Sequence, residues 1–179
     1  MKILDNTIQD YTGTNFSVYK REEGETIIKY NTSGDIIENN EMYSKVMLGK
    51  CETCNPFYKN SFDGFSYDTV LVVGLGLGLI PYELSEVNGC SKIDVLEIDQ
   101  EIIDYTILSG HLNSDINLIQ GDIYNYTTTE TYDLIIIDTI WYEHEMSNED
   151  CELLKSRLLP NINTGGALYF PIKEKFIIR

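Results

Sequence analysis

Dense aliphatic runs alternate with more polar stretches along residues 68–172. Five of these runs are rich enough in aliphatic and β-branched residues to predict buried strands. They are Thr69–Val73, Ile93–Ile98, Ile116–Gln120, Leu134–Ile137 and Ala167–Ile172. Strands with so few polar positions are typical of a parallel sheet that is covered on both faces.

Helical signals lie between these runs. A helix after the first run stops at Gly89, and a second, Gln100–Ser109, begins at the cap Asp99 and stops at Gly110. A third, Ser147–Leu159, opens with a cap and acidic residues in its first turn. This alternation predicts an α/β fold with a doubly wound, mainly parallel Rossmann-like sheet. Because only seven residues follow the fifth run, we expect the sheet to be truncated there, with a bare edge.

The first 40 residues have a different pattern. Phe16–Lys20 and Thr26–Tyr30 alternate like strands around a charged loop with a glycine, and Ile36–Ile37 predicts a short third strand. We therefore predict a small N-terminal antiparallel β meander, residues 1–40, before a Rossmann-like domain, residues 41–179. Such a meander buries little by itself, so we expect it to lie on the main domain or on a second subunit.

Glycines and acids occupy the ends of the predicted strands. Gly74, Gly76 and Gly78 follow the first strand, where the backbone must approach a ligand and take angles that a side chain forbids. Glu97 ends the second strand, roughly 20 residues on, where a carboxylate accepts hydrogen bonds from ribose hydroxyls. Two further tips carry acids, Asp122 and Asp138. Because parallel strands end at one edge, these residues predict a nucleoside site.

Composition and charge limit the partners. The chain has 179 residues, of which 42% are hydrophobic and 23% charged, as in a single soluble globular domain. Its net charge of −16 argues against nucleic acid, because phosphate contacts need Lys or Arg, and it suits cationic or neutral small substrates. No run has the roughly 20 apolar residues of a membrane helix, and the start lacks a signal-peptide core. We expect a cytoplasmic protein that binds no membrane.

Four cysteines do not form a recognisable metal site. Cys51 and Cys54 have metal or redox spacing, but no second pair or histidine cluster accompanies them. Cys90 and Cys151 fall at helix ends and are expected to be small buried side chains. The sequence therefore predicts no metal.

With these residues in view, the chain resembles class I S-adenosylmethionine-dependent transferases, and more closely their spermidine synthase branch. The glycine turn and the acidic strand tips match in order and spacing, and the N-terminal meander matches the branch. The matching segments are Gly74–Gly78, Glu97-Ile98-Asp99, Gly121-Asp122, Asp138, Thr26–Tyr30, Gly34-Asp35 and Glu41-Met42-Tyr43.

The resemblance implies a role for each matched residue. The three glycines would pass beneath the amino-acid portion and the sugar of S-adenosylmethionine. Glu97 would hold the ribose hydroxyls, and Ile98 would pack on the adenine face. Asp122 would accept a hydrogen bond from the adenine amino group, with the Ile123 backbone beside the ring. Asp138 matches the acid that takes a proton from the attacking amine.

The chain departs from the spermidine synthase pattern in its charged residues. Those enzymes carry an Asp at the position of Leu77, where it holds the ammonium of decarboxylated S-adenosylmethionine. They carry a second acid at the position of Trp141, where it grips the amine of the acceptor. Each lost contact is worth about 1.5–3 kcal/mol. Aminopropyl transfer is therefore the weaker prediction.

The acceptor pocket is expected among aromatic side chains. Trp141 and Tyr142 follow the fourth strand, and their rings would attract a cationic group. An aromatic loop packed on the body explains the same residues. Tyr43 would reach the amino-acid end of the donor, with Ser44 as its rival, and His144 is an alternative base.

Three hypotheses for the function follow. The first is an S-adenosylmethionine-dependent methyltransferase with a small-molecule acceptor, an amine among the candidates. The second is an aminopropyltransferase that uses decarboxylated S-adenosylmethionine and a polyamine. The third is a non-catalytic nucleoside-binding or assembly subunit. The meander and the expected bare sheet edge favour a homodimer.

Overall fold

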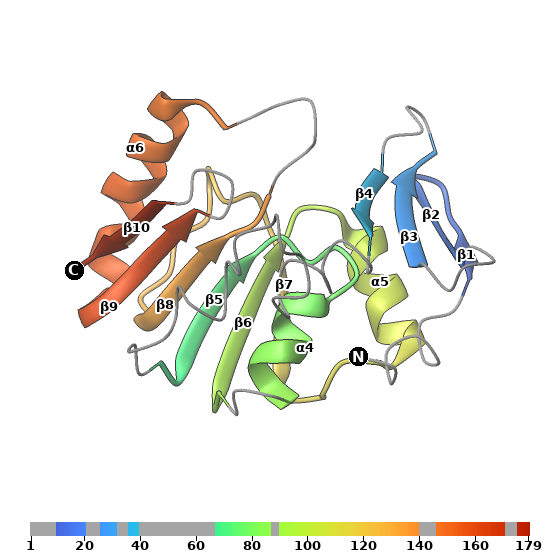
Figure 1. Cartoon of the computed structure of the whole chain (residues 1–179), viewed down its shortest axis with the longest axis horizontal. Coiled ribbons are helices and arrows are strands. Elements are labelled where there is room, and N and C mark those ends of the chain that lie inside the picture. The colour runs from blue at the N-terminus through green and yellow to red at the C-terminus, as the bar shows by residue number, and fades with distance from the viewer. Residues whose placement is uncertain are drawn as a thin grey trace, which may run out of the picture.

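Two β-sheets and three α-helices make up the described part of the chain (Figure 1). The computed structural model describes residues 10–20, 26–31, 36–39, 67–86, 90–139, 146–170 and 175–179. The larger sheet has six strands, in the order β10-β9-β8-β5-β6-β7. Their bounds are β5 Thr69–Val73, β6 Lys92–Glu97, β7 Ile116–Gln120, β8 Tyr132–Ile137, β9 Ile162–Phe170 and β10 Lys175–Ile178.

Five strands of the larger sheet are parallel, as predicted. In the middle of the sheet Val72 of β5 lies between Val95 of β6 and Ile136 of β8. The chain order reverses at β5, since β6 follows on one side and β8 lies on the other. In open α/β sheets a ligand binds at this switch point, beyond the carboxyl ends of the strands.

The sheet carries one strand more than we predicted. β9 begins at Ile162, earlier than the expected Ala167, because Gly165 takes a φ of 84° that allows the strand to continue through an irregular stretch. The chain then returns as β10, antiparallel to β9, with Lys175 opposite Phe170. The expectation of a sheet truncated at its fifth strand with a bare edge is corrected, because β10 pairs along that edge.

Helices α5 and α6 begin where their capping residues predict, and α5 ends where its predicted glycine stop lies. Their bounds are α4 Leu79–Glu86, α5 Gln100–Ser109 and α6 Asn148–Leu158, followed by the 3₁₀ turn Leu159–Asn161. The Asp99 side chain accepts from the backbone of Glu101 at the start of α5, and Gly110 ends the helix with a φ of 61°. Ser147 and Asp150 form a capping box on α6. Gly89 lies outside the described residues.

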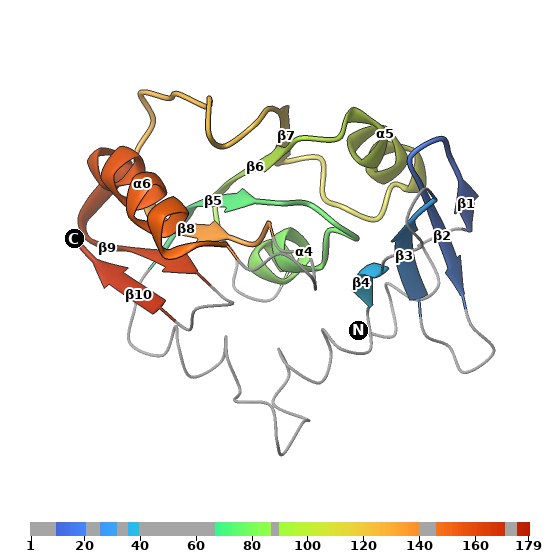
Figure 2. The same ribbon diagram turned by 90° about the horizontal axis from the view of Figure 1, so that it is seen from above.

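Two apolar clusters lie on opposite faces of the larger sheet (Figure 2). On one face α4 and α5 share an apolar cluster with Ile93 and Val95 of β6. On the other, α6 presents its predicted face to β8 and β9. That face consists of Cys151, Leu154 and Leu158. None of the helices in the described ranges has the length and hydrophobicity of a membrane span.

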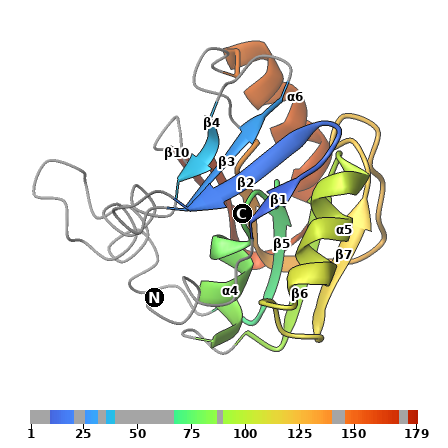
Figure 3. The same ribbon diagram turned by 90° about the vertical axis from the view of Figure 1, so that its right-hand side faces the viewer.

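The N-terminal meander lies on the main domain, against α5 (Figure 3). Its strands are β1 Tyr11–Thr12, β2 Phe16–Lys20, β3 Thr26–Tyr30 and β4 Ile36–Asn39, which pair antiparallel in that order. The rings of Tyr11 and Phe16 have centroids 5.1 and 5.8 Å from the ring of Tyr105 on α5. The three rings bury the meander against the helix.

A carboxylate of α5 fixes the loop between β1 and β2. Glu101 accepts hydrogen bonds from the backbone nitrogens of Thr14, at 2.5 Å, and Asn15, at 2.7 Å, and from the hydroxyl of Tyr11 at 3.1 Å. The Asn15 side chain donates to Asp99 at 3.1 Å. The meander is therefore attached close to the end of β6.

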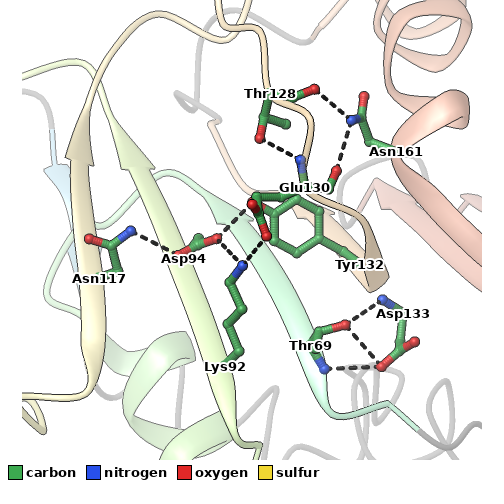
Figure 4. A network of polar contacts seen from close by, with 9 residues as sticks. All are labelled: Thr69, Lys92, Asp94, Asn117, Thr128, Glu130, Tyr132, Asp133 and Asn161. Carbon is green, nitrogen blue, oxygen red and sulfur yellow. Dashed lines mark hydrogen bonds and ion pairs between the residues drawn. The ribbon is translucent and has the colours of Figure 1, made fainter.

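Polar side chains near the amino ends of the central strands hydrogen-bond to one another (Figure 4). The buried Asp94 accepts from the Tyr132 hydroxyl at 2.7 Å and from the Asn117 side chain at 2.9 Å. Asp133 accepts from the backbone nitrogen and the hydroxyl of Thr69, both at 3.0 Å. This edge of the sheet uses its carboxylates to hold strands together.

Candidate functional site

The glycine turn after β5 has a backbone that only glycine permits. Gly74, Gly76 and Gly78 have φ angles of 100°, 52° and 75°. A Cβ added to Gly74 would lie 2.1 Å from the carbonyl oxygen of Asp138, which rules out any side chain there. The ends of β5 and β8 therefore approach each other closely beneath the turn.

Glu97 at the end of β6 supports the turn. Its Oε2 accepts from the backbone nitrogen of Leu75 at 2.8 Å, and its Oε1 accepts from the backbone nitrogen of Asp99 at 2.9 Å. Only 7% of the residue is exposed. These bonds fix the carboxylate, and each oxygen keeps a lone pair for a ligand hydroxyl.

Ile98 presents an apolar surface at the same edge. It follows Glu97 directly and is 60% exposed. Leaving a large aliphatic side chain in water forfeits about 1.5–3 kcal/mol of burial free energy, so a flat apolar ligand face would gain by covering it.

Asp122 follows β7 and organises its own turn. Its carboxylate accepts from the backbone nitrogen of Tyr124 at 2.9 Å and from the Asn125 side chain at 2.7 Å. The preceding Gly121 donates from its backbone to the Glu97 carbonyl at 2.9 Å, which joins the ends of β6 and β7. The Ile123 side chain is buried in the core. Asp122 thus lies at the predicted edge, where it has a local role as well.

Asp138 at the end of β8 carries a carboxylate of unusual basicity. Its backbone nitrogen donates to the Val73 carbonyl at 2.8 Å, which places it beside the start of the glycine turn. Burial raises the pKa of its carboxyl to about 6. Within the described ranges we find no hydrogen-bond donor to this carboxylate. A carboxylate with a pKa near neutrality is suited to accept a proton.

His111 is a residue of this site that the sequence did not indicate. Its imidazole lies under the turn, with Nε2 2.8 Å from the Leu77 carbonyl oxygen. No motif marks it, because it stands alone in a connection after Gly110.

The predicted acceptor residues lie outside the part of the chain that the structure describes. These are Tyr43, Trp141 and Tyr142, with their alternatives Ser44 and His144; the Cys51–Cys54 pair also lies outside it. The acceptor pocket therefore stays a prediction. The described residues contain no group of three His, Cys, Asp or Glu side chains that would hold a metal.

The sheet edge combines three chemical features. The turn offers backbone without side chains, Glu97 offers fixed acceptors close to exposed Ile98, and Asp138 offers a base. Together they suit a ligand that has vicinal hydroxyls and a flat apolar ring and is placed beside a group that loses a proton.

Comparison with known proteins supports the fold. No family model matches the chain. One curated relative, the tRNA1(Val) (adenine(37)-N6)-methyltransferase of Glaesserella parasuis serovar 5 (strain SH0165), is 25% identical over 84 residues. The match covers 45% of this chain and 36% of that protein, so the chain spans well under half the length of this relative.

Solved structures, two of them of proteins named as methyltransferases, share the architecture. The plantazolicin methyltransferase BpumL, in complex with a monoazolic desmethylPZN analog and S-adenosylhomocysteine, is 23% identical with a TM-score of 0.52 and covers 73% of this chain and 48% of its own. DhpI, also in complex with S-adenosylhomocysteine, is 16% identical with a TM-score of 0.53 and covers 73% and 61%. The N-methyltransferase NodS from Bradyrhizobium japonicum WM9 is 21% identical with a TM-score of 0.50 and covers 65% and 68%. The chain has the class I S-adenosylmethionine-dependent methyltransferase fold.

Proposed function

We propose that this chain is an S-adenosylmethionine-dependent methyltransferase that acts on a small acceptor, with an amine as the favoured acceptor group. The observation that carries the proposal is the bond from Leu75 of the glycine turn to Glu97, since it fixes a buried carboxylate where this fold binds a nucleoside. The fold shared with methyltransferases supports the same reading.

The residues at the sheet edge fit the donor. Gly74, Gly76 and Gly78 carry no side chains and have positive φ angles, so the backbone of the turn can come close to a ligand. Glu97 would hold the ribose hydroxyls, Ile98 would cover one adenine face, and Asp122 would accept from the adenine amino group. When bound, S-adenosylmethionine supplies a methyl group activated by its sulfonium centre.

Asp138 is the proposed acid–base residue. With a pKa raised to about 6, its carboxylate is ionised at neutral pH and still accepts a proton readily. Methyl transfer requires little more than alignment of the acceptor, so one orienting carboxylate is enough. The net charge of −16 would also attract a cationic acceptor.

Leu77 favours methyl transfer over aminopropyl transfer. Its side chain is fully buried in the apolar cluster under the turn and so presents no charge at the turn. An ammonium group of decarboxylated S-adenosylmethionine would lack a partner at this position. The spermidine synthase-like alternative, with a polyamine acceptor, retains the support of the N-terminal meander and of the net charge of −16.

A nucleic-acid acceptor is not proposed. The relative from Glaesserella parasuis is named for action on tRNA, but a charge of −16 opposes contact with a phosphate backbone. We propose instead a small-molecule acceptor, a cytoplasmic location and a homodimer.

Calorimetric titration with S-adenosylmethionine and S-adenosylhomocysteine tests the donor. We expect binding of both in the micromolar range, and no binding at millimolar concentration would refute the proposal. Incubation with radiolabelled donor and a panel of small amines tests the acceptor. Incubation with decarboxylated donor and putrescine tests the alternative, because aminopropyl transfer would release methylthioadenosine.

A further inference from the structure

The chain after α5 returns beneath the glycine turn and places one imidazole there. Gly110 ends the helix in the left-handed conformation, and His111 follows it with only 7% of its surface exposed. Its Nε2 lies 2.8 Å from the Leu77 carbonyl oxygen, and its Nδ1 lies 2.7 Å from the Ser109 hydroxyl. A Cβ added to Gly78 would lie 3.1 Å from Nε2, so the ring is packed against the turn itself.

These partners determine the tautomer of His111. A carbonyl oxygen only accepts, so Nε2 must carry the proton and donate it to Leu77. In the neutral ring Nδ1 is then an acceptor. The Ser109 hydroxyl lies 2.7 Å from Nδ1 and 3.1 Å from the Thr106 carbonyl oxygen, and the shorter contact indicates that it donates to Nδ1. Burial lowers the pKa of the imidazole, which favours this neutral form.

The hydrogen bond from His111 to the Leu77 carbonyl fixes the peptide unit between Leu77 and Gly78. The carbonyl of this unit accepts from His111, and its nitrogen, on Gly78, donates to the Leu75 carbonyl at 2.8 Å. Gly78 has no side chain to oppose rotation of the unit. Rotation of this peptide would move the Leu77 carbonyl oxygen out of the glycine turn and break both hydrogen bonds.

We propose that His111 is a positioning residue for the donor site, which holds the Leu77–Gly78 peptide in the orientation that binds the donor. This inference rests on the proposed function, because it assigns the glycine turn to S-adenosylmethionine. It adds a second support to the turn: Glu97 fixes the nitrogen of Leu75 and His111 fixes the carbonyl of Leu77.

The test compares S-adenosylhomocysteine affinity among His111 variants by calorimetry. His111→Leu keeps the bulk but cannot donate, and we expect about tenfold weaker binding, which equals about 1.4 kcal/mol and is within the range for one lost hydrogen bond. His111→Gln keeps a donor at similar reach and is expected to bind within about threefold of the wild type. Circular dichroism and the melting temperature show whether each variant is folded.

A structural role alone would lower the melting temperature of His111→Leu without weakening the binding by the folded protein. Equal affinity of folded His111→Leu and wild type would therefore overturn this inference and leave the proposed function intact. Absence of binding by the wild type would refute the proposed function, and this inference with it.

Nuclear magnetic resonance gives a second readout if His111→Leu does not fold. In wild type labelled with ¹⁵N-histidine, we expect a slowly exchanging Nε2 proton that His111→Gln removes. Its resonance should shift on addition of S-adenosylhomocysteine, since the turn that it supports contacts the ligand. A resonance that does not move while the ligand binds would overturn the inference.

Discussion

The Oε2 atom of Glu97 lies 2.8 Å from the backbone nitrogen of Leu75 and joins the end of β6 to the glycine turn after β5. The acid and the turn thus form a single unit, although 22 positions separate them in the sequence. We therefore expect a change at Glu97 to disturb the glycine turn, and a change in the turn to disturb the Glu97 carboxylate.

Replacement of Glu97 by alanine should weaken donor binding strongly while the chain stays folded. The variant loses the ligand acceptors and leaves the Leu75 nitrogen without its partner, a change of about 1.5–3 kcal/mol for each hydrogen bond to the charged group. We expect calorimetry to show that the affinity for S-adenosylhomocysteine falls by about 10-fold to 100-fold. Glu149→Gln, on the exposed first turn of α6, is the control and should bind like wild type.

Gly74→Ala should be severely destabilising because of the Asp138 carbonyl. The added methyl would lie 2.1 Å from that oxygen, on a backbone with a φ of 100°. We expect a loss of about 3 kcal/mol or more in urea unfolding, since strain and a clash act together.

Gly110→Ala separates the cost of backbone strain from the cost of the steric clash. Gly110 also has a positive φ, 61°, but nothing lies within 4 Å of its added Cβ. Its cost should be the left-handed strain alone, about 1 kcal/mol. Equal losses for both variants would show that the approach of Asp138 to Gly74 is not what requires glycine.

Asp138→Asn should stabilise the fold at neutral pH and remove activity. Burial raises the pKa of Asp138 from its ordinary value of 3.8 to about 6 in the folded state, so ionisation disfavours the folded state as pH rises from 3.8 through 6. The variant avoids this cost, and its free energy of unfolding at pH 7 should be about 1–3 kcal/mol higher than that of the wild type. Methyl transfer by the wild type should rise with pH through about 6, where the carboxyl loses its proton.

Asp133→Asn should destabilise the fold at neutral pH, whereas Asp138→Asn should stabilise it, so Asp133→Asn serves as the matched control. Burial raises the pKa of Asp133, but hydrogen bonds from Asn163, Asp68 and Thr69 outweigh it and lower the pKa to about 2. Its contribution to stability is present above pH 3.8 and is lost as pH falls through 2. We expect the variant to lose about 1–2 kcal/mol at pH 7. Destabilisation by both variants would contradict the assignment for Asp138.

Glu101→Gln should release the loop at Thr14 and Asn15 from α5. Glutamine has one accepting oxygen and a nitrogen that only donates, so it can accept only one of the two backbone hydrogen bonds that the carboxylate receives at 2.5 and 2.7 Å. Hydrogen exchange of at least one of these two amides should accelerate while exchange in β5 stays slow. Asp104→Asn is the control, because the Asp104 carboxylate accepts from the Gln100 side chain of the same helix at 2.8 Å. Unchanged exchange in Glu101→Gln would show that other contacts hold the loop.

Local signals in the sequence predicted the features that depend on neighbouring residues. Asp99 and Gly110 delimit α5 because a cap needs only the first or last turn of a helix. The aliphatic runs predicted β5 and β7 to the residue. The positions of Glu97 and Asp138 at one edge followed from parallel strands.

Features that depend on distant residues could not be predicted. β10 forms because it pairs with the edge of β9, where Lys175 lies opposite Phe170. It begins only five residues after β9 ends. His111 reaches Leu77 across 34 positions, and no spacing in the sequence predicts such a contact. The raised pKa of Asp138 depends on how the surrounding chain encloses it.

The two ends of the central strands divide the work of the molecule. Asp94 and Asp133 bind neighbouring strands at the amino edge, whereas Glu97 and Asp138 lie at the opposite edge, where we propose that the donor binds. Stability can therefore be altered at the amino edge, by redesign of a hydrogen-bond network that lies apart from the proposed donor site.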